Sequence, residues 1–465
     1  MQIEQLEREF ERVQTTLADG PIVPSVTVDE IRSHLAGRYH FRTALPLDEV
    51  VQDAERMLHD WQVQVTHPRY LGLFNPAVTL PSVIAETLVA MYNPQLANWR
   101  TSPGANEIER HTLGWLAAKF GLPRDTIATF TSGGSEANLS AVTTALTHTF
   151  PQYGDHGLCN LPAQPSLYLT DEAHHGFNKI AHMTGLGRRA VRPVTTDRRL
   201  KLDVDSLRCR VRQDREQGWA PFLVVGTAGT TAAGVIDPLS DIAQFCREEG
   251  LWFHADAAWG GAAILSPALK EHLAGIEQAD SITCDAHKWF SVPMGCGMFF
   301  CRHRESLARA FHADVTYMSG KQSGPVFDPL TNSMQWSRRF IGLKLFLALA
   351  HLGESGYAAM IDHQARLGNV LRKALTASGW QVVNETPLPL VCFTREHLDP
   401  GAFLASLHRR QIAWMSEARI DGAPVLRACI TNYRTTEANI HQIVLEMSQL
   451  FQQGAGALQP EPHLQ

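Results

Sequence analysis

Short apolar runs alternate with helical patterns through the middle of the chain. Between residues 67 and 340, runs with strand-like composition are each followed by a stretch with helical spacing, and these runs are 126–130, 166–169, 222–225, 251–253, 281–284 and 296–300. Continuous apolar runs of this length are typical of strands that are buried on both faces of a parallel sheet. The pattern therefore predicts an α/β fold, with a largely parallel sheet between layers of helices.

The two ends of the chain have different patterns. Residues 1–66 are helix-like, with amphipathic stretches at 3–17 and 47–63 separated by proline-bearing turns. Beyond residue 340, a long helix around 341–352 leads into a segment with apolar runs at 390–393 and 425–430. We therefore expect three parts. These are a helical N-terminal arm (1–66), a large domain (67–340) and a smaller C-terminal α+β domain (341–465).

Composition narrows the class of protein. The 465 residues are 44% apolar and 19% charged, with a formal net charge of −6, so neither nucleic acid nor an acidic membrane surface is expected as a partner. The eight cysteines form no CxxC pair, the 21 histidines form no HExxH motif, and the N-terminus has no signal-peptide pattern. The longest apolar stretch, 340–352, is interrupted by Lys344 and is too short to span a bilayer. We expect a cytoplasmic enzyme without a metal site.

Two motifs at predicted strand ends carry groups that pyridoxal phosphate chemistry requires. Lys288 lies in residues 285–289 (DAHKW), and Asp256 lies in residues 254–259 (HADAAW). A lysine holds this cofactor as an imine, and a carboxylate keeps its ring nitrogen protonated. Taken singly, the lysine is also compatible with a solvated loop and the aspartate with a helix cap. Both would lie at the carboxyl ends of strands, where open α/β sheets bind ligands.

A third motif, residues 131–138 (TSGGSEAN), follows a predicted strand and begins a predicted helix. Backbone N–H groups at such a helix start, together with the helix dipole, attract phosphate. The motif lacks the lysine of a Walker loop, which argues against a nucleoside triphosphate. By itself it is equally well a strand-to-helix turn capped by serine. In combination with Lys288 and Asp256, it favours a phosphate-bearing cofactor.

The order of these motifs resembles that of the group II pyridoxal-phosphate-dependent decarboxylases, the family of aromatic-L-amino-acid and glutamate decarboxylases. The resemblance runs from residues 67–70 (HPRY) to about residue 450. It implies the type I fold of pyridoxal-phosphate-dependent transferases, with a mostly parallel seven-stranded sheet in the large domain. It also implies a homodimer whose active sites are shared between subunits.

The resemblance assigns a role to each matching position. Lys288 would form the imine with pyridoxal 5'-phosphate, and Asp256 would pair with the ring nitrogen. Positions around the cofactor follow in the same way: His174 on one ring face and Ala258 on the other, Gly134, Ser135 and His287 at the phosphate, and Thr230 beside cofactor and substrate. Asp285 departs from the pattern, because many relatives carry a phosphate-binding asparagine there. A second anion beside a phosphate is repelled unless it is protonated or paired, so the role of Asp285 stays open.

The reaction implied is decarboxylation of an L-amino acid to its amine and carbon dioxide. It ends with protonation at Cα by a positioned acid. Tyr317, in residues 315–318 (VTYM), begins a polar stretch with glycines and a proline, and it matches the family's catalytic loop tyrosine. A tyrosine that only anchors a loop is the alternative. Relatives with phenylalanine there tend to be aldehyde synthases, so Tyr317 favours simple decarboxylation.

The substrate is less closely specified. The family's pocket positions match Leu73 and Phe74, with Ala97 contributed by the partner subunit, and two of these are smaller or less aromatic than in aromatic decarboxylases. An aromatic amino acid is slightly favoured over an acidic one. The alternatives are an aldehyde synthase, an aminotransferase or carbon–carbon lyase of the same fold, and a pyridoxal-phosphate-binding scaffold without turnover.

Overall fold

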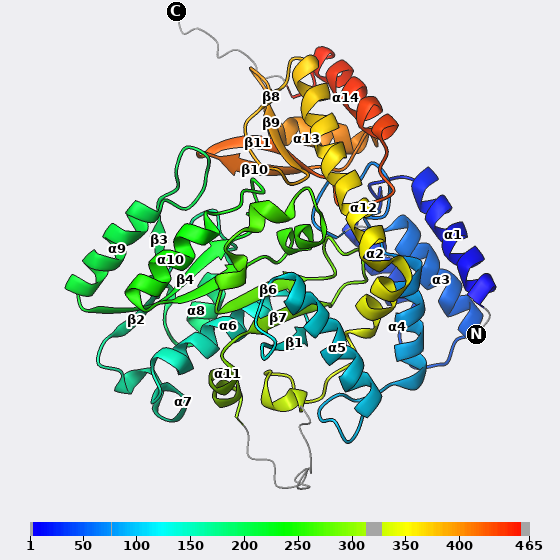
Figure 1. The fold of residues 1–465 in the computed structure, drawn as a ribbon. Helices are drawn as coiled ribbons and strands as arrows, with labels where there is room; N and C mark the ends of the chain where they lie inside the picture. The colour runs from blue at the N-terminus through cyan, green and yellow to red at the C-terminus, as the bar shows by residue number, and fades with distance from the viewer. Residues whose placement is uncertain (1–2, 76, 313–327, 457–465) are drawn as a thin grey trace, which may run out of the picture. The chain divides into compact units, whose positions relative to one another are not determined.

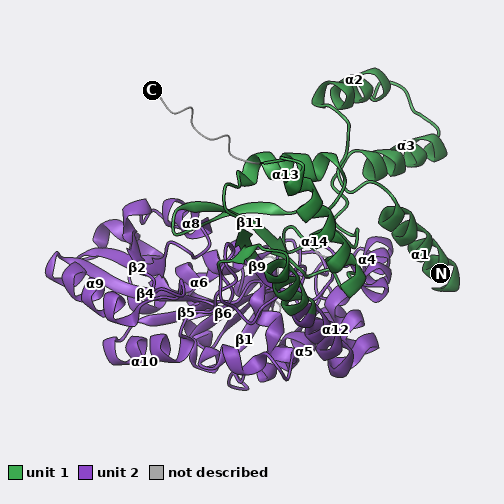
Figure 2. Cartoon of the chain, turned by 90° about the horizontal axis from the view of Figure 1, so that it is seen from above, with its two compact units in different colours: residues 1–77, 367–383, 392–465 green, residues 78–366, 384–391 purple. Residues whose placement is uncertain are grey.

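The structure, a computed structural model, describes residues 3–75, 77–312 and 328–456. It divides into two compact units, which are coloured separately in Figure 2. The first comprises Met1–Ala77, Leu367–Val383 and Cys392–Gln465, and the second comprises Val78–Arg366 and Asn384–Val391. The three-part division expected from the sequence stays a prediction.

The second unit contains a seven-stranded sheet with the order β1-β7-β6-β5-β4-β2-β3 (Figure 1). β7 runs antiparallel to both of its neighbours, and the other adjacent pairs are parallel. The expected mostly parallel, seven-stranded sheet is thus confirmed. Its strands are β1 (Ile127–Thr131), β2 (Gln164–Thr170), β3 (Val191–Val194), β4 (Trp219–Thr227), β5 (Trp252–Asp256), β6 (Ser281–Asp285) and β7 (Gly297–Cys301).

β3 is the one strand of this sheet that the apolar pattern did not predict. It is four residues long, lies at the sheet edge and contains Pro193. Only its last residue is buried. An edge strand tolerates proline because one side of its backbone needs no ladder partner, so it carries little of the apolar signal of a central strand.

The second unit also contains eight of the described helices. They are α4 (Leu80–Tyr92), α5 (Pro103–Lys119), α6 (Gly134–Thr149), α7 (Tyr153–His156), α8 (Gly176–Met183), α9 (Val204–Glu216), α10 (Leu239–Glu249) and α11 (Arg304–Ala310). Of these, α5, α6, α8, α9 and α10 pack on strands of this sheet. α6 packs on β4 to β7, and its alanines join a core cluster with Leu167, Phe222 and Phe299. These small side chains let the helix lie close to the sheet. That packing positions the N-terminus of α6 at the end of β1.

The first unit contains a helical N-terminal segment and a four-stranded sheet with the order β10-β11-β9-β8. The N-terminal helices, which confirm the expected helical region, are α1 (Ile3–Asp19), α2 (Val28–Arg38) and α3 (Leu47–Asp60). The strands are β8 (Gln381–Val382), β9 (Leu390–Thr394), β10 (Ser416–Ile420) and β11 (Ala423–Cys429), with the helices α13 (Pro400–Arg409) and α14 (Glu437–Gln452).

α12 (Leu343–Ala377) is longer than the helix predicted around 341–352. Its backbone is interrupted at Gly353, where φ is 67° and ψ is 175°. Glycine adopts a positive φ at little cost, so the chain bends there and then resumes the helix. Across the described residues, no helix has both the length and the apolar character needed to cross a membrane.

Candidate active site

The three chemical motifs converge on one cavity of about 320 Å³ in the second unit. It opens where β1, β5 and β6 end, and it is lined by Ser132, Gly133, Gly134, Ser135, Glu136, Asn138, His174, Thr227, Gly229, Thr231, Asp256, Ala258, Trp259, Asp285, His287 and Lys288. Residues separated by more than 150 positions in the sequence thus face one space. The carboxyl edge of the sheet is the ligand-binding edge that this fold class predicts.

The turn between β1 and α6 forms an anion cradle. α6 begins at Gly134, and the first N–H groups of a helix have no intrahelical acceptor. Glu136 bends back and accepts hydrogen bonds from the backbone N–H (2.8 Å) and the hydroxyl (2.7 Å) of Ser132. Ser132 is therefore engaged by the protein, which leaves the N-terminus of α6 to meet an anion.

Gly134 has to be glycine because the opposite wall is so close. A Cβ at this position would lie 2.9 Å from Oδ2 of Asp285 and 3.3 Å from the Cβ of Ala258. Any side chain would displace the buried carboxylate or fill the cradle. The motif's second glycine thus provides space as well as a helix start.

Lys288 and Asp285 form an ion pair inside the cavity, with Nζ 2.9 Å from Oδ2. Asp285 is buried, and its Oδ1 has no hydrogen-bond partner. His287 accepts a hydrogen bond on Nδ1 from the backbone N–H of Cys296 (3.1 Å), which puts the proton of the neutral ring on Nε2. Burial lowers the pKa of His287, so this ring is a neutral donor. Asp285, whose role the sequence left open, is therefore paired with Lys288.

Asp256 lies at the end of β5 and is buried. Its Oδ2 accepts a hydrogen bond from Nδ2 of Asn138 (2.9 Å), and its Oδ1 accepts one from the backbone N–H of Ala258 (3.2 Å). Both donors are neutral groups, so neither of them is a counter-ion for this carboxylate. Asn138 was not singled out as a site residue, although it closes the motif 131–138.

His174 lies in the loop between β2 and α8 and lines the same cavity. Its Nδ1 accepts a hydrogen bond from the backbone N–H of Gly176 (3.1 Å), which holds the ring and leaves Nε2 as the donor. His174 is exposed, and partial desolvation by the neighbouring protein lowers its pKa. Ala258 also lines this cavity.

Thr230 is not among the residues that line the cavity. Its side chain is buried, and its hydroxyl accepts a hydrogen bond from the backbone N–H of Val235 (3.1 Å). Its neighbours Gly229 and Thr231 line the cavity, as does Thr227. A tight turn thus directs the side chain of Thr230 into the protein, which a sequence motif does not reveal.

The expected pocket residues belong to different units, Leu73 and Phe74 to the first and Ala97 to the second. Leu73 is 50% exposed, whereas Phe74 is buried with the guanidinium of Arg427 4.9 Å from its ring centre. Ala97 is buried, and its carbonyl accepts a hydrogen bond from the backbone N–H of Leu330. Tyr317 lies outside the described residues.

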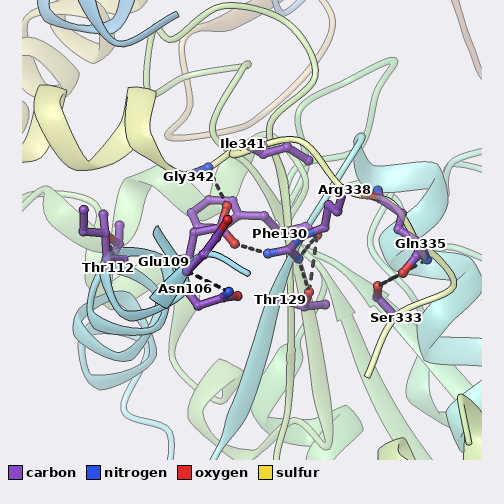
Figure 3. Close-up of polar contacts among 12 residues, drawn as sticks. Asn106, Glu109, Thr112, Thr129, Phe130, Ser333, Gln335, Arg338, Ile341 and Gly342 are labelled. Carbon is purple, nitrogen blue, oxygen red and sulfur yellow. Dashed lines mark hydrogen bonds and ion pairs between the residues drawn. The ribbon is translucent and has the colours of Figure 1, made fainter. Parts of the chain in front are cut away.

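A second polar cluster is centred on Arg338 and Glu109 (Figure 3). Gln335 donates to both carboxylate oxygens of Glu136 at 2.8 Å. Arg338 donates to the hydroxyl of Thr129 (2.8 Å) on β1 and forms a buried ion pair with Glu109 of α5. These contacts join the segment before α12 to β1 and to the start of α6.

Taken together, the cavity fits pyridoxal phosphate. It presents a lysine amine, a buried carboxylate whose two donors are neutral, and a helix N-terminus with no room for a side chain at Gly134. These are the groups that hold the aldehyde, the ring nitrogen and the phosphate of this cofactor. Among the described residues, no cluster of three histidine, cysteine or acidic side chains is arranged to hold a metal ion.

Comparison with known proteins identifies the family of this chain. The model of the pyridoxal-dependent decarboxylase conserved domain matches residues 38–396. The chain belongs to the pyridoxal-dependent decarboxylase family. Members of this family are pyridoxal-phosphate-dependent carboxy-lyases, so the predicted family, enzyme class and cofactor are confirmed.

Individual relatives span most of the decarboxylase chain. It is 28% identical to an aromatic-L-amino-acid decarboxylase of Bacillus atrophaeus over 93% of this chain and 91% of the relative. It is 32% identical to an L-2,4-diaminobutyrate decarboxylase of Acinetobacter baumannii, over 74% of this chain and 71% of the relative. Among solved structures, Oryza sativa TDC with PLP and tryptamine superposes with a TM-score of 0.88 (21% identity, 97% and 96% coverage), and mouse CSAD in its apo form with 0.87 (23%, 96% and 98%). At these identities the two structures support the fold alone.

Proposed function

We propose that this decarboxylase converts an L-amino acid to its amine and carbon dioxide, with an aromatic substrate favoured over an acidic one. The observation that carries the proposal is the convergence of Lys288, Asp256 and the N-terminus of α6 on one cavity. Bound pyridoxal phosphate supplies an electron-withdrawing ring that stabilises the charge left on Cα when the carboxylate departs. In this proposal Lys288 holds the cofactor, and Asp256 keeps the proton on its ring nitrogen.

The remaining cavity residues have supporting roles in the same proposal. Gly134, Ser135 and His287 bind the phosphate, with the neutral His287 donating from Nε2. His174 and Ala258 enclose the ring, and the intervening protein excludes water from the reacting carbon. Asp285 positions the Nζ of free Lys288 within the cavity through their 2.9 Å contact, which gives the anion at this position a role.

Tyr317 is proposed as the acid that protonates Cα. A tyrosine hydroxyl is a suitable donor for such a carbanion. Replacing it by phenylalanine would remove that proton while keeping the ring. In the presence of dioxygen as the oxidant, we expect Y317F to release carbon dioxide but to form less amine and more aldehyde, with ammonia and hydrogen peroxide as the co-products.

In this proposal the substrate preference is set by Leu73 and Phe74, with Ala97 contributed by a second copy of the chain. All three are apolar, and they present no cation for an acidic side chain. The nearby Arg427 is engaged by the protein itself, donating to the carbonyl of Gly72 (2.9 Å) and lying over the ring of Phe74. A relative with an aromatic substrate in its name aligns over nearly the whole chain, which is consistent with this preference.

A homodimer and a cytoplasmic location complete the proposal. The N-terminal segment exposes large apolar side chains, among them Phe41 in the loop between α2 and α3 (91% exposed) and Leu47 at the start of α3 (77%), which association with a second copy would bury. All eight cysteines are free, as in a reducing compartment. Sedimentation of wild type and of L47E, with fractionation of expressing cells, tests both statements. A monomeric wild type would refute the first, and an exported protein the second.

The central experiment supplies the purified protein with pyridoxal phosphate and a panel of L-amino acids, and measures carbon dioxide, amine and aldehyde together. We expect equal amounts of carbon dioxide and amine, with the highest kcat/KM for an aromatic substrate. K288R is the matched variant for K288A, because it keeps a cation opposite Asp285 but cannot hold the cofactor covalently. Both should be inactive. Aldehyde as the main product, or turnover in K288R, would overturn the proposal.

A further inference from the structure

A chain of hydrogen bonds extends from Asp256 into the core of the second unit. Asn138 donates to Asp256 and contacts Nε2 of His254 with its Oδ1 (3.0 Å). The Nδ1 of His254 contacts the hydroxyl of Ser281 (2.8 Å), which also receives Nε1 of Trp252 (2.9 Å). The five residues of this chain of hydrogen bonds are all at most 4% exposed: Asp256, Asn138, His254, Ser281 and Trp252. They come from α6, β5 and β6, and only Asn138 and Asp256 line the cavity.

The two ends of this chain determine the direction of every bond in it. A carboxylate only accepts, so Asn138 must turn its NH2 group to Asp256 and its oxygen to His254. Because the amide oxygen of Asn138 can only accept, Nε2 of His254 must carry a proton and donate to it. In a neutral ring this leaves Nδ1 as an acceptor. The hydroxyl of Ser281 then donates to Nδ1, and its oxygen accepts from Trp252, whose indole N–H only donates. Four successive donors therefore point toward Asp256.

The hydroxyl of Thr283 lies 3.4 Å from Nε2 of His254 and can accept from the same N–H, while Asn138 and Asp256 together disfavour the opposite arrangement. A proton on Nδ1 of His254 would leave the lone pair of Nε2 against the oxygen of Asn138. Turning the amide over would relieve that contact, but it would place the amide oxygen against the carboxylate of Asp256. Burial also lowers the pKa of His254 to about 4, so the ring is neutral and carries a single proton.

We propose that Asn138, His254 and Ser281 are positioning residues that hold the carboxylate of Asp256 in a fixed orientation at the cavity through a fixed tautomer of His254. The inference rests on the proposed pairing of Asp256 with the ring nitrogen of pyridoxal phosphate. Hydrogen bonds aligned in one direction polarise one another in a buried site. Neutral donors orient the carboxylate without cancelling its charge, whereas a charged histidine or lysine in their place would compete with the ring nitrogen.

The test measures binding of pyridoxal phosphate to the full-length apo protein by fluorescence titration, together with the absorption spectrum of the bound cofactor. N138L removes the amide but keeps the number and branching of the side-chain heavy atoms, and S281A removes a hydroxyl two links beyond Asn138. S140A is the matched control. Ser140 is equally buried, lies on α6 two residues beyond Asn138 and donates only to the carbonyl of Glu136. D256N tests the carboxylate itself.

We expect N138L to weaken cofactor binding roughly tenfold or more, the usual effect of losing a hydrogen bond to a charged group, and to shift the spectrum in the direction of D256N. S281A should produce a smaller change of the same kind, and S140A none. If D256N binds the cofactor with wild-type affinity and spectrum, the proposed role of Asp256 is wrong. If D256N is altered while both N138L and S281A behave as S140A does, the positioning inference is wrong and the proposed function stands.

A second measurement does not depend on the cofactor or on the folding of N138L. Histidine 15N NMR of the apo protein identifies the tautomer of His254, with the signal assigned by its loss in H254Q. We expect the Nε2–H form in wild type. In D256N the amide of Asn138 is free to turn over, so the Nδ1–H form should appear. An Nδ1–H tautomer in wild type would overturn the inference.

Discussion

The ion pair between Glu109 and Arg338 gives the sharpest stability prediction. Both side chains are almost fully buried, at 4% and 2% exposure. Arg338 also donates to Thr129 (2.8 Å) and to the carbonyl of Phe130 (3.2 Å), and Glu109 accepts from the backbone N–H of Gly342 (2.9 Å) (Figure 3). Each charge is therefore held mainly by the other, with neutral groups around them.

Removing one partner should cost much more than removing both. R338M leaves Glu109 as a buried carboxylate without its counter-ion, at a cost of about 3–5 kcal/mol in the free energy of unfolding. E109L leaves a buried guanidinium, with a similar loss. In the double variant no charge is stranded, and the remaining cost is that of the unpaired backbone groups, roughly 1–3 kcal/mol. The two losses should thus be non-additive by several kcal/mol.

Urea denaturation of the two single variants and the double variant measures this coupling. The matched control is R110M, because Arg110 pairs with Glu107 on the same helix but at 66% and 42% exposure. Exposed pairs contribute at most about 1 kcal/mol. Strictly additive losses in the double variant, or an R338M loss no larger than that of R110M, would refute the reasoning.

The same pair has a signature in pH. Burial raises the pKa of Glu109 above its usual value, and removing Arg338 raises it further. A raised folded-state pKa gives stability that is present at low pH and is lost as the pH rises through that value. R338M should therefore recover part of its deficit between pH 7 and pH 5. A deficit that does not change with pH would argue against a stranded carboxylate.

Three further outcomes follow from particular contacts. G134A should weaken binding of pyridoxal phosphate, because its Cβ would lie 2.9 Å from Asp285. The control G114A should leave binding unchanged, because its Cβ meets nothing within 4 Å. Equal affinities of the two variants in a titration would contradict the proposed phosphate site at Gly134. G72A should destabilise the first unit by roughly 1–3 kcal/mol and alter the near-ultraviolet circular dichroism, because its Cβ would overlap the ring of Trp414. Burial lowers the pKa of His254 to about 4, against 6.5 in the unfolded chain. The free energy of unfolding should therefore fall by up to roughly 3 kcal/mol as the pH drops from 6.5 to 4. In urea denaturation, H254Q should show a weaker dependence of this free energy on pH, and an unchanged dependence would count against a neutral buried ring.

Much of the fold could be predicted because central strands carry a strong local signal. The predicted runs 222–225 and 281–284 lie within β4 and β6. They could be recognised because strands that are buried on both faces are apolar throughout. β3 was missed because an exposed edge strand needs no such pattern. The break in α12 at Gly353 was missed because a glycine in a helical pattern does not show which φ it adopts.

The sequence by itself determined which functional groups are available to bind a cofactor: a lysine and a carboxylate at strand ends, and a glycine-rich helix start. Each of these is a local pattern, and its residue types dictate what it can bind. Only the tertiary structure decided which groups act on one another. Asn138 lies 118 positions from Asp256 and 116 from His254, yet it joins them by direct hydrogen bonds. Thr230 turns away from the cavity to bond Val235, while Thr227 and Thr231 face it. Sheet order and burial decide which of these side chains form hydrogen bonds with one another. Buried polar groups are almost always hydrogen-bonded, and the fold determines which partners lie within reach.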